Sequence, residues 1–386
     1  MLALRLARGT HPLVLVRRLL VAAASAGVGF LLLCSLGYAA AHPASAGSVL
    51  RLLWCFIPLA ATVQFAVAVA RTDPSTRPRP GLSSVGLGPV RLSALAAVST
   101  AISTTLGSLV ALLFFLHLRG DLTGMPFDGG AAEFLGAGTP LPLAAALMLL
   151  ALVPVASTTA SALALRSRPD PARDTFGSEE LPEPAPAPSG LPWGVALVAV
   201  GLAVEAYASR EGAGSAFPLP GRFEATPVAV LAGWTLTAIG LAAAGPGLTY
   251  LCGRALQAVR PGGARLLAGR VLMDEARRIG RPLGIVCAVF AAVFAASVLY
   301  GGDERPWGPL TALGALLVLG CTAATLLTSA LEAKQARAHT TEALLRMGAP
   351  ASVLRTATAL RAAALLALFA PLTWVIAELA ALPLAK

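Results

Sequence analysis

The sequence predicts an all-α protein that crosses a membrane about nine times, and three observations lead to this prediction. Apolar residues make up 56% of the 386-residue chain and charged residues only 12%, about half the charged share of a soluble domain. The mean hydropathy is +0.76. The apolar residues gather in stretches of the length that a helix needs to cross a bilayer, about 20 residues, with lysines and arginines between them. The chain is therefore expected to be a polytopic integral membrane protein.

Four apolar stretches precede the first long interruption. They are residues 18–41, 50–70, 93–117 and 141–165. A proline-rich and partly acidic segment follows at residues 166–190, with the composition of an extended linker. We therefore expect four spans in a first unit, followed by a linker.

Five further apolar stretches follow the linker. They are residues 191–209, 226–251, 282–300, 309–331 and 351–382. The first of them is short and carries Glu205, and the last contains Pro371, a residue that kinks helices. Three side chains within predicted spans are charged, namely Glu205, Arg361 and Glu378. Each lies close to a predicted membrane boundary, so we expect these side chains to reach the interface.

The lysines and arginines orient the spans. With the N-terminus in the cytosol, 23 of these 29 residues lie in predicted cytosolic segments and six on the outer side. Cytosolic loops carry an excess of Lys and Arg. The asymmetry supports both the number of spans and a cytosolic N-terminus. The outer segments are too short for a folded extracellular domain.

A basic segment at residues 252–281 differs from the other loops. Arg270, Arg277, Arg278 and Arg281 lie among apolar residues such as Leu266, a pattern typical of a helix on a membrane surface. A cationic loop that only fixes the topology is the alternative.

Motifs for catalysis, nucleotide binding and metal binding are absent from the sequence. There is no GxxxxGK[ST], HExxH or GxSxG, the four histidines are far apart, and the five cysteines are scattered. Each of these motifs places specific groups around a substrate or a metal. We therefore expect neither an enzyme nor a bound cofactor or metal. The net charge of +10 follows the predicted topology, so we expect no nucleic-acid partner.

Two segments that each precede a span share a weak internal sequence similarity. At an offset of 262 residues, Leu82 corresponds to Leu344 and Gly86 to Gly348. Leu92 corresponds likewise to Leu354. Both segments fall on the predicted cytosolic side. This internal similarity indicates two related halves, each with a short, partly apolar cytosolic segment.

The second of these segments reads Glu-Ala-Leu-Leu-Arg-Met-Gly-Ala-Pro-Ala-Ser-Val-Leu-Arg over residues 342–355. It resembles the permeases of the FtsX type, which are membrane subunits of a class of ABC transporters. In that family a short Leu-Leu-Arg element with a following Gly-Ala pair forms the coupling helix that docks on the ATPase. The resemblance implies this role for Leu344, Leu345, Arg346 and Gly348, and for Leu82 and Gly86 in the first half. Met347 completes the apolar face, because it lies beside the two leucines.

The same resemblance implies a domain organisation. Residues 1–165 and 282–386 would be two permease repeats, with residues 166–190 a linker and 191–251 two connecting spans. Residues 252–281 would be the membrane-surface helix, because Arg270–Arg281 also resembles the helix that precedes the family's second repeat.

The expected function is that of a plasma-membrane permease subunit, with a cytosolic ABC ATPase, expected as a dimer, and membrane lipids as partners. It would couple ATP hydrolysis by that partner to movement of a hydrophobic or amphipathic substrate. Two alternatives stay open at this point. One is a secondary carrier in which Glu205 is linked to an ion, and the other is a membrane scaffold without transport.

Overall fold

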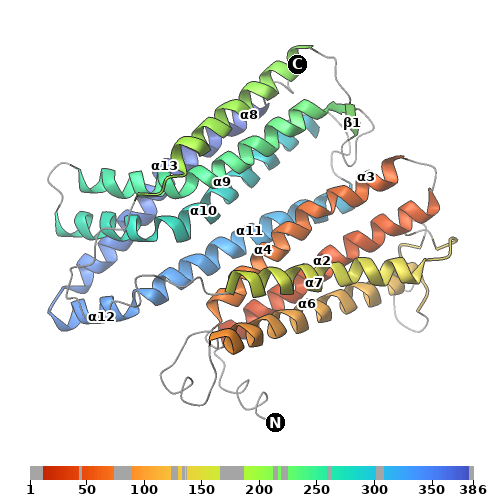
Figure 1. Cartoon of the computed structure of the whole chain (residues 1–386), viewed down its shortest axis with the longest axis horizontal. Helices are drawn as coiled ribbons and strands as arrows, with labels where there is room; N and C mark the ends of the chain where they lie inside the picture. The colour runs from red at the N-terminus through yellow and green to blue at the C-terminus, as the bar shows by residue number, and fades with distance from the viewer. Residues whose placement is uncertain are drawn as a thin grey trace, which may run out of the picture. The chain divides into compact units, whose positions relative to one another are not determined.

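The computed structural model describes most of the chain. The described residues are 12–42, 46–73, 89–122, 129–132, 135, 137–165, 187–211, 216–218, 225–258, 262–300 and 308–381. Within them the protein is built almost wholly from helices (Figure 1). In chain order the elements are α2 (Pro12–Ala41), α3 (Ala46–Trp54), α4 (Phe56–Thr72), α6 (Pro89–Arg119), α7 (Leu143–Leu165), α8 (Leu191–Glu211), β1 (Ala216–Pro218), β2 (Ala225–Pro227), α9 (Val228–Gln257), α10 (Gly263–Tyr300), α11 (Pro309–Ala336), α12 (Ala338–Arg346) and α13 (Ala351–Ala381).

The predicted fold class is confirmed, because the described residues form an all-α polytopic membrane protein. Eight helical segments are long and apolar enough to cross a membrane, and Leu191–Tyr207 of α8 is a shorter apolar helix. Together they correspond to the nine predicted spans.

Two local features were not predicted. The second span is interrupted at Cys55, where a turn separates α3 from α4. Pro58 explains the break, because a proline has no N–H to donate to the carbonyl of Trp54 four residues earlier. The other feature is a short antiparallel pair, β1 and β2, in which Phe217 lies opposite Thr226. It lies between α8 and α9 in the chain.

The chain divides into two compact units. The first comprises Met1–Asp174 and Pro309–Cys321, and the second Thr175–Gly308 and Thr322–Lys386. Helix α11 therefore contributes its first half to one unit and its second half to the other. The predicted boundary at residue 282 does not coincide with the end of any element.

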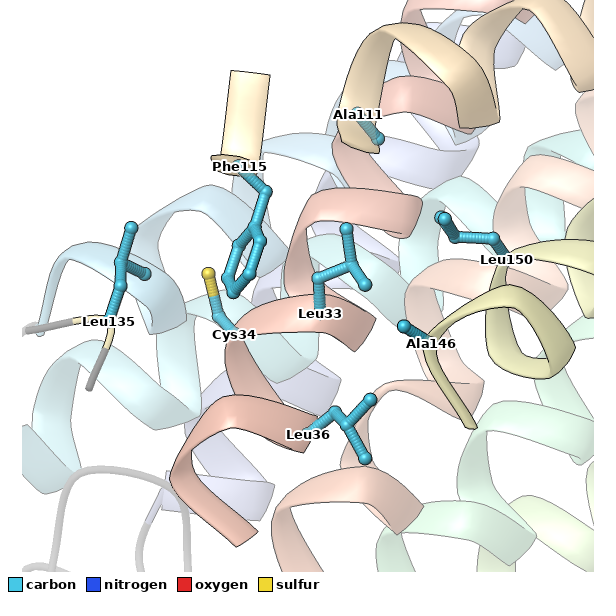
Figure 2. Close-up of a cluster of buried hydrophobic side chains, with 8 residues drawn as sticks. All are labelled: Leu33, Cys34, Leu36, Ala111, Phe115, Leu135, Ala146 and Leu150. Atoms are coloured by element: carbon cyan, nitrogen blue, oxygen red, sulfur yellow. The ribbon is translucent and has the colours of Figure 1, made fainter. Parts of the chain in front are cut away.

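Helix α2 forms the core of the first unit. Leu33, Cys34 and Leu36 of α2 pack with buried side chains of α6 and α7 and with Leu135 from the connection between them (Figure 2). Hydrogen bonds join the same helices, since the Ser25 hydroxyl donates to the Thr104 carbonyl at 2.8 Å. Bonds of this kind and small residues hold membrane helices together, because apolar side chains gain little by leaving lipid for protein.

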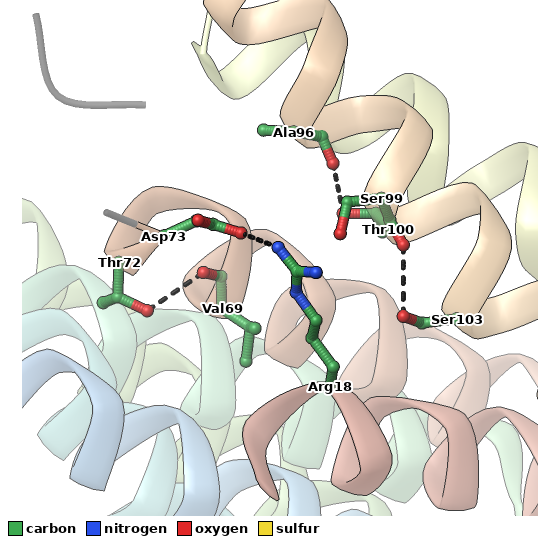
Figure 3. A network of polar contacts seen from close by, with 8 residues as sticks. All are labelled: Arg18, Val69, Thr72, Asp73, Ala96, Ser99, Thr100 and Ser103. Atoms are coloured by element: carbon green, nitrogen blue, oxygen red, sulfur yellow. Dashed lines mark hydrogen bonds and ion pairs between the residues drawn. The ribbon is translucent and has the colours of Figure 1, made fainter. Parts of the chain in front are cut away.

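An ion pair joins the first half of α2 to the end of α4. Arg18 Nη2 lies 2.5 Å from Asp73 Oδ2, and the Asp73 side chain is 8% exposed. Figure 3 shows this pair beside the hydroxyls of Ser99, Thr100 and Ser103 on α6. These three hydroxyls and the ion pair line one small pocket.

Glycines bring α8 against α9 in the second unit. A Cβ added at Gly201 would lie 2.3 Å from the Thr237 hydroxyl oxygen, and one at Gly240 would lie 2.8 Å from the Gly194 carbonyl oxygen. Neither space admits a larger side chain. The glycines recur every seventh residue, at 194 and 201 on α8 and at 233, 240 and 247 on α9, so they fall on one face of each helix.

A second set of glycines brings α9 against α10. A Cβ at Gly245 would lie 2.1 Å from the Gly280 carbonyl oxygen, and one at Gly253 would lie 2.7 Å from that of Gly269. Helix α9 is thus held by close backbone contact on two sides.

The basic segment at residues 252–281 is continuous with a span. Its first residues end α9 and the rest begin α10, a single helix of 38 residues. At 1.5 Å per residue α10 is about 57 Å long, against a hydrocarbon thickness of about 30 Å. Pro246 and Pro282 lie inside the two helices, and both helices change direction along their length (Figure 1). Kinks of this kind occur at prolines. They separate the membrane span of α10 from its first part, residues 263–281, which we call the arm.

Candidate functional site

The segment predicted to dock on an ATPase forms a short helix of its own. Helix α12 lies between α11 and α13, and its last turn contains Leu344, Leu345 and Arg346. Leu345 is 46% exposed and Met347, which follows the helix, is 76% exposed, whereas Leu344 is half-buried. The neighbouring side chains that face solvent are largely polar. The structure thus exposes two large apolar side chains, two residues apart, in a largely polar segment.

A tight turn connects α12 to α13. Gly348 has a φ of +89°, a conformation that favours glycine. The Gly348 N–H donates to the Leu345 carbonyl at 3.1 Å, and the Ala349 N–H donates to the Leu344 carbonyl at 3.0 Å. This pair of bonds is the Schellman motif, which ends a helix at a fixed angle. Pro350 follows directly, so α13 starts anew at Ala351.

An ion pair fixes the other end of α12. Arg337 separates α11 from α12, and its Nη1 donates to Glu275 Oε1 of α10. The Glu275 side chain is only 11% exposed. Arg361 of α13 and Arg278 of α10 also act electrostatically on this carboxylate. The short helix is therefore connected to α10 through charge and to α13 through the turn.

Arg346 does not contribute to that network. It pairs with Glu342 one turn earlier at 2.6 Å, and both side chains are largely exposed. Such exposed pairs on a helix stabilise it by about 0.3–0.5 kcal/mol. Arg346 therefore remains accessible to a carboxylate on another protein.

The first copy of the segment, Leu82 and Gly86, lies outside the described residues. Helix α6 starts at Pro89, just after it.

The four arginines predicted for the membrane-surface helix are all exposed. Arg270, Arg277 and Arg281 follow one another at intervals of seven and four residues on α10, so they share one face, and Arg278 lies beside them. A neighbouring face packs on α9 through Gly269 and Gly280. The arm therefore presents a basic stripe.

Sequence reasoning missed the placement of Glu205. The expectation that its side chain reaches the interface is wrong, because the side chain is 1% exposed and lies against α9. The seven-residue spacing of glycines on α8 and α9 is the signal that could have revealed this face. By contrast, Glu378 is exposed and Arg361 is half-buried.

In the described residues, no group of three or more His, Cys, Asp or Glu side chains could hold a metal ion. The four cysteines within the apolar spans are buried. Comparison of the chain with protein-family models, curated proteins and solved structures finds no match.

Proposed function

We propose that this chain is the permease subunit of an ABC transporter in the plasma membrane, and that a separate cytosolic ATPase supplies the energy. The observation that carries the proposal is α12. A short helix with two exposed apolar side chains has a fixed turn at one end and a buried ion pair at the other. This arrangement suits a part that receives force from another protein and passes it to α10 and α13.

The apolar face is suited to a cleft in the ATPase. Leu345 and Met347 supply apolar area, and Arg346 supplies a positive charge that reaches beyond them. Burial of one leucine stabilises an interface by about 1.5–3 kcal/mol, which is about tenfold to hundredfold in affinity.

The proposed substrate is hydrophobic or amphipathic, such as a lipid, a lipopeptide or a membrane-active peptide. Charged side chains are few in the spans, so a small hydrophilic solute would lose its hydration without compensation. The substrate would be moved outward or extracted at the outer leaflet. ATPase stimulation of the reconstituted complex by amphipathic peptides, lipids, sugars and amino acids tests this class, and a response confined to sugars or amino acids would contradict it.

The test of the function begins with the genes beside the one for this chain, of which one is expected to encode a P-loop ATPase. Co-expression of the two proteins and co-purification then measure the docking. Leu345→Asp is expected to weaken recovery of the ATPase about tenfold or more, because a charge cannot replace the leucine in an apolar cleft.

Leu345→Met is the matched control. It keeps an apolar side chain of similar volume at the same exposed position, and exchanges of this kind are well tolerated. It should leave recovery unchanged. Equal recovery with Leu345→Asp and the unmodified chain, both monodisperse on size exclusion, overturns the docking assignment.

A further inference from the structure

Glu205 is an acidic side chain held inside the second unit. It lies 14 residues after the start of α8, about 21 Å along the helix, which places it in the outer half of the membrane in the predicted orientation. A Cβ at Gly233 would lie 2.5 Å from the Glu205 Cγ. The Glu205 side chain fits there because Gly233 has no side chain of its own.

The protein provides only one hydrogen bond to the carboxyl group of Glu205, and that bond is long. The Thr237 hydroxyl donates to Glu205 Oε1 across a long 3.4 Å, and Oε2 has no hydrogen-bond partner. The indole Nε1 of Trp234 is likewise buried without an acceptor. Buried polar groups of native proteins are almost always bonded, so two unsatisfied groups together indicate a ligand.

The two unsatisfied residues line the same cavity. It offers a volume of about 40 Å³ to water, and apart from Thr237 the rest of its lining is apolar, from α9, α10 and α13. One water needs about 10–15 Å³ by this measure. The cavity therefore has room for water beside the carboxyl group.

Among the described side chains, no positive charge lines this cavity, and Glu205 is the one ionisable residue in its lining. Among the side chains that the structure describes on the neighbouring helices, which leave out those of residues 208–211 and 298–300, the other ionisable ones are Tyr250, Cys252 and Arg254 on α9, Cys287 and residues up to Arg281 on α10, Arg355, Arg361 and Glu378 on α13, and Tyr207 on α8. None of these belongs to the cavity lining, and Tyr207 and Glu378 are exposed.

We propose that Glu205 is a proton-binding site within the membrane, and that the cavity beside it holds the water through which the proton enters and leaves. An ionised carboxylate in an apolar interior without a countercharge is costly. The protonated form is neutral, and its O–H can donate to water while the indole N–H donates to the same water. A metal cation fits poorly, because hard cations take about six oxygen ligands and an indole N–H repels positive charge.

The proposal does not depend on an ATPase partner, so it is tested on the full-length chain alone. A hydrophobic carbodiimide adds the O–H of a protonated carboxyl group across its C=N bond, and the adduct rearranges to a stable N-acylurea with no group lost. Modification of the solubilised protein at about pH 7, where an exposed glutamate with a pKa of about 4.3 is ionised, is followed by peptide mass spectrometry. Glu205 is expected to be modified at least about tenfold more than Glu378, the exposed carboxyl group of α13.

Infrared spectroscopy gives a second readout that needs no reagent. The unmodified protein should show a protonated carboxyl band at about pH 7 that is lost in Glu205→Gln and kept in Glu378→Gln. Glutamine has the shape of the protonated side chain, so Glu205→Gln should stay folded, which size exclusion checks. Modification of Glu205 only under the acidic conditions that also modify Glu378, or a band that survives in Glu205→Gln, overturns the proposal.

Discussion

Arg337, the residue between α11 and α12, donates to the buried carboxylate of Glu275 on α10. The pair joins residues that are 62 positions apart in the sequence. It links the start of the short helix to the basic arm through their side chains. In the proposed function it transmits movement of α12 to α10.

Glu275→Gln should therefore weaken both stability and coupling. A hydrogen bond to a charged group contributes about 1.5–3 kcal/mol, and the variant leaves Arg337 without its countercharge. We expect a lower midpoint of thermal unfolding and reduced stimulation of the ATPase at unchanged ATPase binding. In the double variant Glu275→Gln with Arg337→Gln both partners are neutral, so its losses should be smaller than the sum of the losses of the two single variants. If the losses simply add, the pair is not the connection.

Gly348→Ala should disturb the turn before α13. The left-handed conformation costs a residue with a Cβ about 1–2 kcal/mol, and no atom lies within 4 Å of the added Cβ, so strain in the backbone is the only penalty. Coupled ATPase activity should fall while ATPase binding persists. Gly348→Asn is the control, because asparagine tolerates this conformation, and it should retain more activity than the alanine variant. Equal loss in both would point to packing instead of backbone conformation.

The basic stripe on α10 should recognise anionic lipid. Each arginine near an anionic membrane surface contributes about 1 kcal/mol. Replacement of Arg270, Arg277 and Arg281 by glutamine should therefore reduce enrichment of anionic phospholipid around the protein by about a hundredfold at low salt. Native mass spectrometry of the protein from mixed anionic and zwitterionic nanodiscs measures this enrichment. Lys334→Gln, which removes an exposed charge from α11, should have little effect.

The glycine contacts predict opposite effects of the same substitution at two places. Gly201→Ala forces a Cβ to within 2.3 Å of Thr237, and such overpacking costs about 1–3 kcal/mol. Gly320→Ala on α11 meets no atom within 4 Å and should be neutral or stabilising, because alanine favours the helix by about 1 kcal/mol over glycine. Unfolding midpoints in detergent compare the two. A tolerant Gly201 would show that α8 does not pack on α9 as described.

Single cysteines test the orientation. Ala338 and Gly138 are exposed, and the charge pattern assigns them to the cytosolic and outer sides. A membrane-impermeant thiol reagent added outside intact cells should label Gly138→Cys and spare Ala338→Cys until the cells are opened. The native cysteines give little background, since all but Cys252 are buried. Labelling of both from one side would refute the nine-span topology.

The parts that could be predicted from the sequence are those that depend on local composition. The length of each apolar stretch was enough to predict each span. The break at Cys55 was missed because hydropathy does not register that Pro58 lacks a donor. The burial of Glu205 was missed because distance from a predicted boundary says nothing of which helix face a residue occupies. The pairing of Arg337 with Glu275 depends on how α10 and α11 meet, which no local pattern contains.

The arm formed by the start of α10 has a mechanical consequence. Residues 263–281 precede Pro282 and extend for about 28 Å. If the arm pivots by about 10° at Pro246 and Pro282, its tip travels about 5 Å, the rise of one helical turn. With such a pivot at the two prolines, a change too small to disturb the glycine contacts would become a displacement of a full helical turn at the far end of the arm.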